Sequence, residues 1–163
     1  MKKVLLTTLI ICSSMLCFAQ QSLLSYEDIK YLLHNNLASA DTFLTAKGYT
    51  VKNKNAKKKF NEYTLPIKGG TFVNVNVRAD GRRMFIDMQT TEIAQLNLIQ
   101  NSISQYLNKE SITGADILTY TIKNLATIYI TTNDTVPYSP IRKNYDIQIV
   151  ADKNVTADMG LNN

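Results

Sequence analysis

The clearest pattern of hydrophobic and polar positions lies between residues 63 and 88. Valines at every second position alternate with polar side chains over residues 73–78, as in a strand with one buried face. Gly69-Gly70 precedes this segment and Asp80-Gly81 follows it, and both pairs tolerate the backbone angles of tight hairpin turns. The pattern therefore predicts three successive antiparallel strands over 60–67, 71–78 and 82–88.

Apolar residues at helical spacing flank this meander on both sides. Ser25 and Asp28 form a capping-box pattern, and the apolar stripe after them predicts one long helix over 26–47 that ends before Gly48. A short strand over 49–52 and a polar, basic connection over 53–59 lead into the meander. A second helix, capped by Thr90 or Thr91, is predicted to fade near residue 108, with these positions on its inner side: Ile93, Leu96, Ile99 or Gln100, Ile103 and Leu107.

Period-two alternation returns in the last third of the chain. It predicts strands over 117–122, 125–132 and 145–150, the first two joined by a tight Lys123-Asn124 turn. The loop over 133–144 is the longest connection without regular structure and holds Tyr138 between Pro137 and Pro140. The polar residues 153–163 are expected to form a flexible tail.

Each half of the chain thus places strands after a helix, which predicts an α+β fold. The expected arrangement is two helix-plus-antiparallel-meander units, over 25–89 and 90–152, with the helices packed on one face of the sheet or sheets and the other face in water. Tyr63-Thr64-Leu65 and Tyr120-Thr121-Ile122 occupy matching places 57 residues apart. A tandem duplication explains this match, although the shared identity is sparse.

The order of helix then three-strand meander, taken twice, resembles the tandem repeats of the β-lactamase-inhibitor-protein family. The resemblance covers most of the chain and is one of architecture, without a specific motif. Members of that family carry a disulfide in each repeat, whereas both cysteines of this chain, Cys12 and Cys17, lie in the first 19 residues. The resemblance implies only that a sheet face binds another protein.

The N-terminus has the pattern of a secretory signal peptide. Two lysines follow Met1, an apolar run extends from Val4 to Phe18, and Cys17-Phe18-Ala19 supplies small residues where a signal peptidase reads. We expect cleavage after Ala19 and a periplasmic or secreted protein whose single domain spans 20–152. A membrane anchor is the alternative, but about 15 residues are short for a bilayer. Lipidation is another, although Ile11 and Leu16 before the cysteines fit a lipobox poorly.

Positive charge is concentrated in the first half of the chain. The net charge is +5 overall, and removal of Lys2 and Lys3 with the signal would leave +3. Between Lys47 and Arg83 there are ten basic residues against two acidic ones. This segment is a candidate surface for an acidic envelope glycan or lipid or an acidic protein, although lysine-rich loops also serve solubility alone. Nucleic acid fits the charge but fits secretion poorly, so we expect no nucleic-acid partner. The candidate residues are Lys52, Lys54, Lys57, Lys58, Lys59, Arg78, Arg82 and Arg83.

Catalytic signatures are missing from the sequence. The single histidine, His34, lies within the first predicted helix, no Gly-x-Ser-x-Gly elbow is present, and Gly69-Gly70 lacks the lysine of a phosphate-binding loop. Asp87 and Glu92 lie near each other at a predicted strand-to-helix junction, and they suit a helix N-terminus as well as acid–base chemistry. We expect no enzyme activity, no cofactor and no metal.

Tyrosines supply the remaining candidate site. Three of the nine, Tyr129, Tyr138 and Tyr145, cluster around the loop over 133–144, and exposed tyrosines are typical of recognition surfaces. Tyrosines in strands also cover half-buried faces. The sequence thus favours a non-catalytic protein-binding module, as an inhibitor, immunity protein or adaptor, over the alternative of an envelope-associated polyanion-binding protein.

Overall fold

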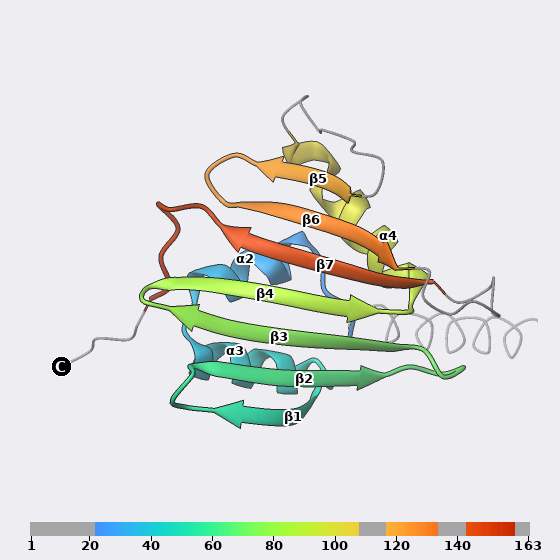
Figure 1. Ribbon diagram of the computed structural model, residues 1–163, viewed down its shortest axis with the longest axis horizontal. Helices are drawn as coiled ribbons and strands as arrows, with labels where there is room; N and C mark the ends of the chain where they lie inside the picture. Colours follow the sequence, from blue (N-terminus) through green and yellow to red (C-terminus); the bar gives the residue numbers. More distant parts are fainter. Residues whose placement is uncertain (1–21, 108–116, 134–142, 159–163) are drawn as a thin grey trace, which may run out of the picture.

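The computed structural model describes residues 22–107, 117–133 and 143–158. Within these ranges the strands form one antiparallel sheet with the order β1-β2-β3-β4-β7-β6-β5 (Figure 1). The chain is α+β, as the sequence predicted, and the sheet is a single continuous one. The strands are β1 (Thr50–Asn55), β2 (Phe60–Pro66), β3 (Phe72–Asp80), β4 (Arg83–Thr90), β5 (Ile117–Ile122), β6 (Ala126–Asn133) and β7 (Asn144–Ala151).

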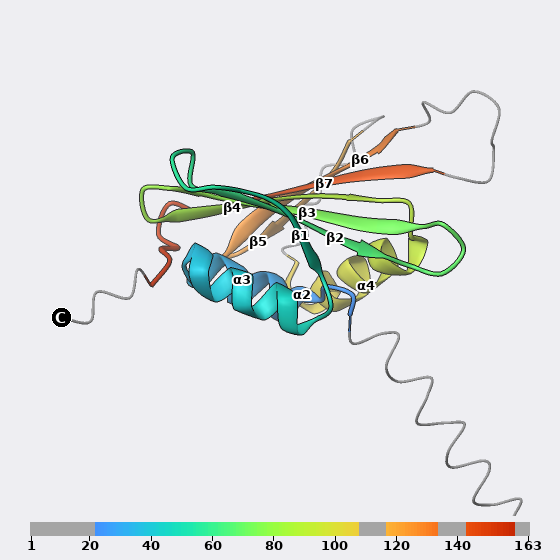
Figure 2. The same cartoon turned by 90° about the horizontal axis from the view of Figure 1, so that it is seen from below.

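The described helices lie on one face of this sheet, and none of them covers the opposite face (Figure 2). They are α2 (Tyr26–His34), α3 (Leu37–Ala46) and α4 (Ile93–Ile103), with a 3₁₀ turn at Ser104–Tyr106. The core lies between the two layers because alternate residues of each strand point toward the helices. The fully buried Val73, Val75 and Val77 of β3 confirm the alternation on which the meander was predicted. None of the helices in the described ranges is long and apolar enough to cross a bilayer.

The long helix predicted over 26–47 is wrong, because the structure divides it into α2 and α3. Asn35 ends α2 with extended backbone angles, and Asn36 starts α3 with a side-chain cap. The Asn36 Oδ1 accepts hydrogen bonds of 3.0 Å from both the Ala38 and the Ser39 N–H groups. Asparagine bonds backbone groups in this way more readily than it continues a helix, and two in succession allow the chain to turn.

The second predicted helix exists, but its cap and one of its inner positions differ from the prediction. Glu92, rather than Thr90 or Thr91, caps α4 by accepting from the Ala94 N–H, and Thr90 ends β4. Ile93 is 49% exposed, whereas the polar Gln95 is fully buried. The apolar spacing therefore predicted the helix correctly, but it placed Ile93 on the buried side and missed Gln95 there.

The turn residues agree with the sequence patterns. Gly81 and Asn124 both have φ of +59°, in the left-handed region that the Asp80-Gly81 and Lys123-Asn124 hairpins require. β1 is longer than the predicted strand over 49–52, and its pairing with β2 shifts between Val51 and Asn53. Such a bulge on an edge strand turns that edge away from regular pairing.

The expected flexible tail is instead packed as far as residue 158. Val155 and Ala157 are buried, and the Ala157 N–H donates to the Arg82 carbonyl at 2.7 Å. The Asp158 N–H donates to the carbonyl of His34 at 2.8 Å. Val155 and Ala157 alternate with exposed residues, and the two hydrogen bonds place residues 157 and 158 beside the β3–β4 turn and the end of α2. Residues 159–163 lie outside the described ranges.

Candidate functional site: the open sheet face

The uncovered side of the sheet, which we call the open sheet face, carries mainly uncharged polar side chains. Its residues alternate along each strand with buried ones, so they point away from the helices. The register aligns them into rows that cross the strands. One row contains Glu62, Asn76, Asp87, Gln148, Tyr129 and Thr119, and the next contains Thr64, Asn74, Gln89, Asp146, Thr131 and Ile117.

Two identical patterns meet at the centre of this face, where β4 pairs with β7. Asp87-Met88-Gln89 lies antiparallel to Asp146-Ile147-Gln148, with Met88 opposite Ile147. Asp87 is therefore opposite Gln148, and Gln89 is opposite Asp146. The four polar side chains form a square with approximate two-fold symmetry, in which each carboxylate has an amide beside it. We call this arrangement the Asp-Gln square.

A polar hollow of about 270 Å³ lies over the Asp-Gln square. Asn76 of β3 and Thr131 of β6 extend its lining on either side, so its wall comes from four adjacent strands. These side chains offer carboxylate and amide oxygens together with amide and hydroxyl donors. The hollow is thus equipped to hold a small polar group.

Neither carboxylate of this square forms an ion pair closer than 4 Å with another described residue. Within the described ranges the ion pairs closer than 4 Å join Lys30 to Glu27, Lys47 to Asp28 and Lys54 to Asp41, all away from the square. Burial raises the pKa of Asp87, and the charge of Arg78 acts in the opposite direction. The Oδ1 atoms of Asp146 and Asn144 are buried without a hydrogen-bond partner in the described part of the chain. Such groups cost free energy until something satisfies them.

An aromatic side chain with two arginines borders the square toward one end of the strands. The guanidinium carbons of Arg78 and Arg83 lie 5.1 and 5.2 Å from the centre of the Phe85 ring. Arg83 also donates to the carbonyl of Ala151, which ties β4 to the end of β7. Arg83 is therefore engaged within the sheet through one of its guanidinium donors.

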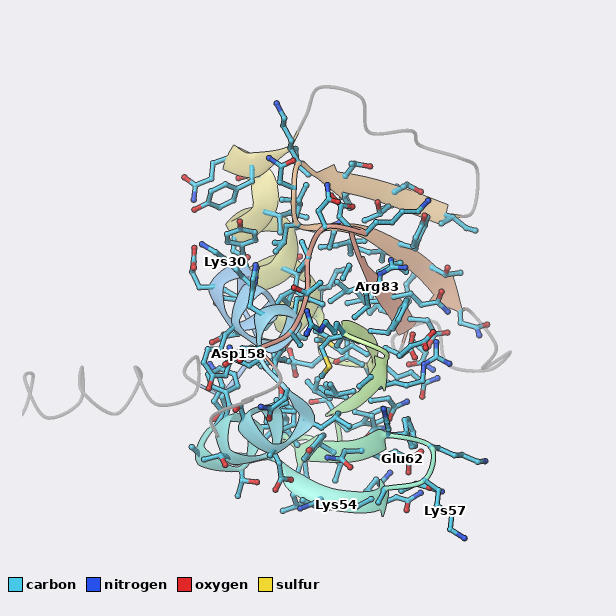
Figure 3. All side chains as sticks on the ribbon, turned by 90° about the vertical axis from the view of Figure 1, so that its left-hand side faces the viewer. Lys30, Lys54, Lys57, Glu62, Arg83 and Asp158 are labelled. Carbon is cyan, nitrogen blue, oxygen red and sulfur yellow. The ribbon has the colours of Figure 1, made fainter. Side chains whose placement is uncertain are left out.

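The other basic candidates lie either on the edge strand β1 or in the turns at one end of the sheet. Lys54 donates to Asp41 of α3 at 2.8 Å and so faces the helices, while Lys52 is exposed on the edge strand β1. Lys57, Lys58 and Lys59 form the β1–β2 turn and Arg82 the β3–β4 turn, at the same end of the sheet. Figure 3 views this end, with Lys57 projecting from it and Arg83 near the middle of the molecule.

The structure separates the three predicted tyrosines. Tyr129, which is 37% exposed, lies on the open sheet face opposite Gln148. Tyr145 alternates with Asp146 and packs against the core from the helix side. Tyr138 lies outside the described residues. A combined surface of Tyr129 and Tyr145 is therefore wrong, because the pairing of β6 with β7 places their side chains on opposite faces.

Asp87 and Glu92, the carboxylates considered together for acid–base chemistry, also have separate environments. Glu92 accepts from the Ala94 N–H and from the Thr71 hydroxyl at 2.8 Å, so its carboxylate caps α4 on the helix side. Asp87 lies on the open sheet face and plays no part in that cap. His34 is exposed and its Nδ1 lies 2.8 Å from the carbonyl of Lys30. The described residues hold no group of three or more side chains suited to a metal ion.

Sequence reasoning missed the Asp-Gln square, although a signal for it exists. The two Asp-apolar-Gln triplets are 59 residues apart, close to the 57 residues that separate the two Tyr-Thr segments. A search for repeats extended to these triplets would have found both. Their meeting across β4 and β7 depends on the sheet order, which the spacing alone does not contain.

Comparison with known proteins adds no relative to this picture. No protein-family model, curated protein or solved structure gives a significant match to the chain. The function is therefore argued from the geometry of the described residues.

Proposed function

We propose that this chain is a periplasmic or secreted, non-catalytic module that binds another protein across its open sheet face. Inhibitor, immunity and adaptor roles all fit this description. The observation that carries the proposal is the two-layer arrangement, in which the described helices cover one face of the sheet (Figure 2). The register of the strands places polar, hydrogen-bonding side chains on the other face. An uncovered antiparallel sheet is stable in water, but such a row of asparagine, glutamine, threonine and tyrosine also suits a polar protein interface.

The composition of this face supports a protein partner. Tyr129 supplies an exposed aromatic ring, and Phe60 and Phe85 add partly buried rings toward one end. The polar residues around them can hydrogen-bond a partner backbone or side chain. Aromatic anchors surrounded by adaptable polar contacts are characteristic of recognition surfaces.

The arrangement of the strands supports a tandem origin of the chain. The last strand of each proposed unit, β4 and β7, pairs at the centre of the sheet, and the Asp-apolar-Gln triplets lie across that junction. The first unit has one more strand and one more helix than the second in the described ranges. The duplication predicts that related chains retain matching triplets in both halves, and an alignment of their halves without such matches would contradict it.

The protein-binding proposal is tested by a capture experiment with variants that carry added arginines on the open sheet face. The chain from Gln20 onward is immobilised and exposed to envelope and culture-medium fractions, with washes at low and high salt. We expect one protein to be retained in stoichiometric amount through the high-salt wash. Asn76→Arg with Tyr129→Arg places two bulky charges on the open sheet face and should abolish retention.

The control carries the same added charge on the helix side. Thr45→Arg with Asn97→Arg changes exposed positions of α3 and α4 and should retain the partner normally. Equal retention by both double variants would exclude the open sheet face as the binding surface. Failure of the wild-type chain to retain any protein from either fraction would contradict the proposed function itself.

A second candidate function, polyanion binding, rests on the position of the strand turns. The Ala79 N–H donates to the Lys59 carbonyl at 2.9 Å, which joins the β1–β2 turn to β3 near its own turn. The Asp152 N–H bonds the Leu125 carbonyl at 2.9 Å, so the tail begins beside the β5–β6 turn. Exposed basic residues gather at this end, namely Lys57, Lys58, Lys59, Arg82, Lys123 and Lys153.

This alternative predicts binding that salt weakens steeply. Vesicles containing anionic lipid, and a soluble acidic glycan, should bind the wild-type chain at low ionic strength. Replacing Lys57, Lys58 and Lys59 together by glutamine should reduce this binding at least tenfold. Unchanged binding by the triple variant would remove the basic turns from consideration.

The proposed compartment depends on cleavage of the N-terminal segment, which lies outside the described residues. The mass of the protein isolated from its native cells should correspond to a chain that begins at Gln20. A mass that includes residues 1–19 would contradict cleavage, and an added lipid mass would favour the lipoprotein alternative.

A further inference from the structure

We infer that the hollow over the Asp-Gln square receives the guanidinium group of an arginine from the partner protein. The inference rests on the proposed function, because it names the chemical group that the open sheet face would recognise. The square supplies two carboxylates at opposite corners and two amides at the other corners, all on one surface of the sheet.

Charge complementarity selects a cation for this hollow. Asp87 and Asp146 both line it, and neither forms an ion pair within the described ranges. Arg78, whose charge acts on Asp87, lies over the Phe85 ring at 5.1 Å and is not part of the lining of the hollow. Two carboxylates with one laterally placed arginine leave a net negative site at the centre of an otherwise mostly uncharged face.

The geometry of the square selects a guanidinium among cations. Asp87 and Asp146 are diagonal neighbours on adjacent strands, so these residues are roughly 7–8 Å apart and their Cβ atoms somewhat closer. A planar guanidinium has donors on more than one edge and can bond two carboxylates at the same time. An ammonium group is a compact point charge that suits one carboxylate better than a separated pair. The described residues also lack a third acidic or histidine ligand for a metal ion.

The unpaired polar atoms of the site favour a hydrogen-bond donor. The Asp146 Oδ1 has no hydrogen-bond partner in the described part of the chain and is covered by its neighbours, so a donor in the hollow reaches it only when the Asp146 side chain rotates. Gln89 and Gln148 add amide oxygens that can accept the remaining guanidinium donors. A bound arginine would satisfy these acceptors, whereas an apolar partner side chain would leave them buried and unpaired.

The direct test is an amide-resolved NMR titration of the chain from Gln20 with N-acetyl-arginine amide. The neutral isostere N-acetyl-citrulline amide and the cation N-acetyl-lysine amide serve as comparison probes. We expect the arginine probe to shift the amide resonances of residues 87–89 and 146–148. It should bind at least tenfold more tightly than the citrulline probe and more tightly than the lysine probe. Equal binding of arginine and citrulline, or shifts confined to other regions, would overturn the inference.

Matched variants distinguish binding at this site from a general effect of the negative charge of the protein. Asp87→Asn with Asp146→Asn should weaken the arginine probe at least tenfold, and the dispersion of the same spectra reports whether the variant is folded. Each single substitution should weaken it in part, which provides a second reading if the double variant unfolds. Asp80→Asn with Asp152→Asn removes two acidic residues outside the hollow and should leave the affinity unchanged.

The outcomes for the hollow and for the proposed function are distinguishable. Suppose that the wild-type chain captures a partner, the Asn76→Arg and Tyr129→Arg variant does not, and the Asp87→Asn and Asp146→Asn variant still does. Protein binding then stands and the arginine anchor is wrong. If the arginine probe binds the square while no protein is captured, the guanidinium site stands and the proposed function fails. Loss of the captured partner in both double variants supports both.

Discussion

Gln95 of α4 holds the backbone of Leu24 with both ends of its side-chain amide. Its Oε1 accepts from the Leu24 N–H at 2.9 Å, and its Nε2 donates to the Leu24 carbonyl at 2.8 Å. Both residues are fully buried. The pair replaces the hydrogen bonds that a strand neighbour would supply, and it fixes the segment before α2 against a helix from the second half of the chain.

Replacement of Gln95 by leucine should therefore be strongly destabilising. The side chain keeps a similar volume, but both backbone groups of Leu24 lose their partners inside the core. We expect the free energy of unfolding to fall by roughly 2–4 kcal/mol, measured by urea denaturation. Asn97→Leu on the exposed side of the same helix should change it by less than about 0.5 kcal/mol. A similar loss in both variants would mean that the buried pair contributes little.

Asn36 joins the helix break to the C-terminal segment, and two substitutions can separate these contributions. Its Oδ1 caps α3, and its Nδ2 donates to the Asp158 carbonyl at 3.0 Å. Asn36→Ala removes both interactions and should cost about 1–2 kcal/mol in chemical denaturation. Asn36→Asp keeps the cap acceptor and loses only the donor, so it should cost clearly less. Equal losses would show that the cap is not the stabilising part.

Loss of the hydroxyl group should affect the stability of the protein differently at two buried tyrosines. The Tyr49 hydroxyl is buried without a hydrogen-bond partner in the described ranges, and burial raises its pKa. The Tyr63 hydroxyl donates to Asp41 at 3.1 Å and accepts from Asn61 at 3.0 Å, and burial, as the main cause, raises its pKa to about 12. Tyr49→Phe should leave the melting temperature unchanged or higher.

Tyr63→Phe, in contrast, leaves the Asp41 and Asn61 groups without that partner and should cost about 1 kcal/mol. Thermal unfolding of both variants under identical conditions provides the comparison. A larger loss for Tyr49→Phe than for Tyr63→Phe would contradict the assignment of their hydrogen bonds.

The pKa of Asp87 predicts how this residue affects stability with pH. Burial raises the folded-state pKa above that of the unfolded chain, although the Arg78 charge opposes the shift. Between these two pKa values the folded state binds more protons, so the free energy of unfolding contributed by Asp87 falls as pH rises through that window. Relative to Asp87→Asn, the wild-type chain should therefore lose stability from acidic toward neutral pH.

Urea denaturation of both chains at a series of pH values measures this difference directly. A wild-type advantage that grows with pH would mean that the Arg78 charge outweighs burial. The expected direction also bears on the open sheet face, since a carboxylate that lowers stability at neutral pH is more readily explained by a binding role than by a structural one.

The sequence by itself determined the local elements of this protein. The alternation over 73–78, the turn residues at Gly81 and Asn124 and the spacing of Leu96, Ile99 and Ile103 all depend on neighbours in the chain, and each element they predicted is present. The α+β class followed from the order of these elements. Asn35 and Asn36 both favour helix ends and so indicated the break. The prediction of one long helix relied instead on the apolar stripe, which continues across them.

The tertiary structure alone decided which residues share a surface. Tyr129 and Tyr145 are close in the chain's second half, yet the register of β6 with β7 places them on opposite faces. Asp87 and Asp146 are far apart in sequence, yet the pairing of β4 with β7 brings them to one square. The polar tail packs because the β3–β4 turn and the end of α2 offer it backbone partners. Strand order and register arise from burial summed over the whole sheet, and no local pattern contains that sum.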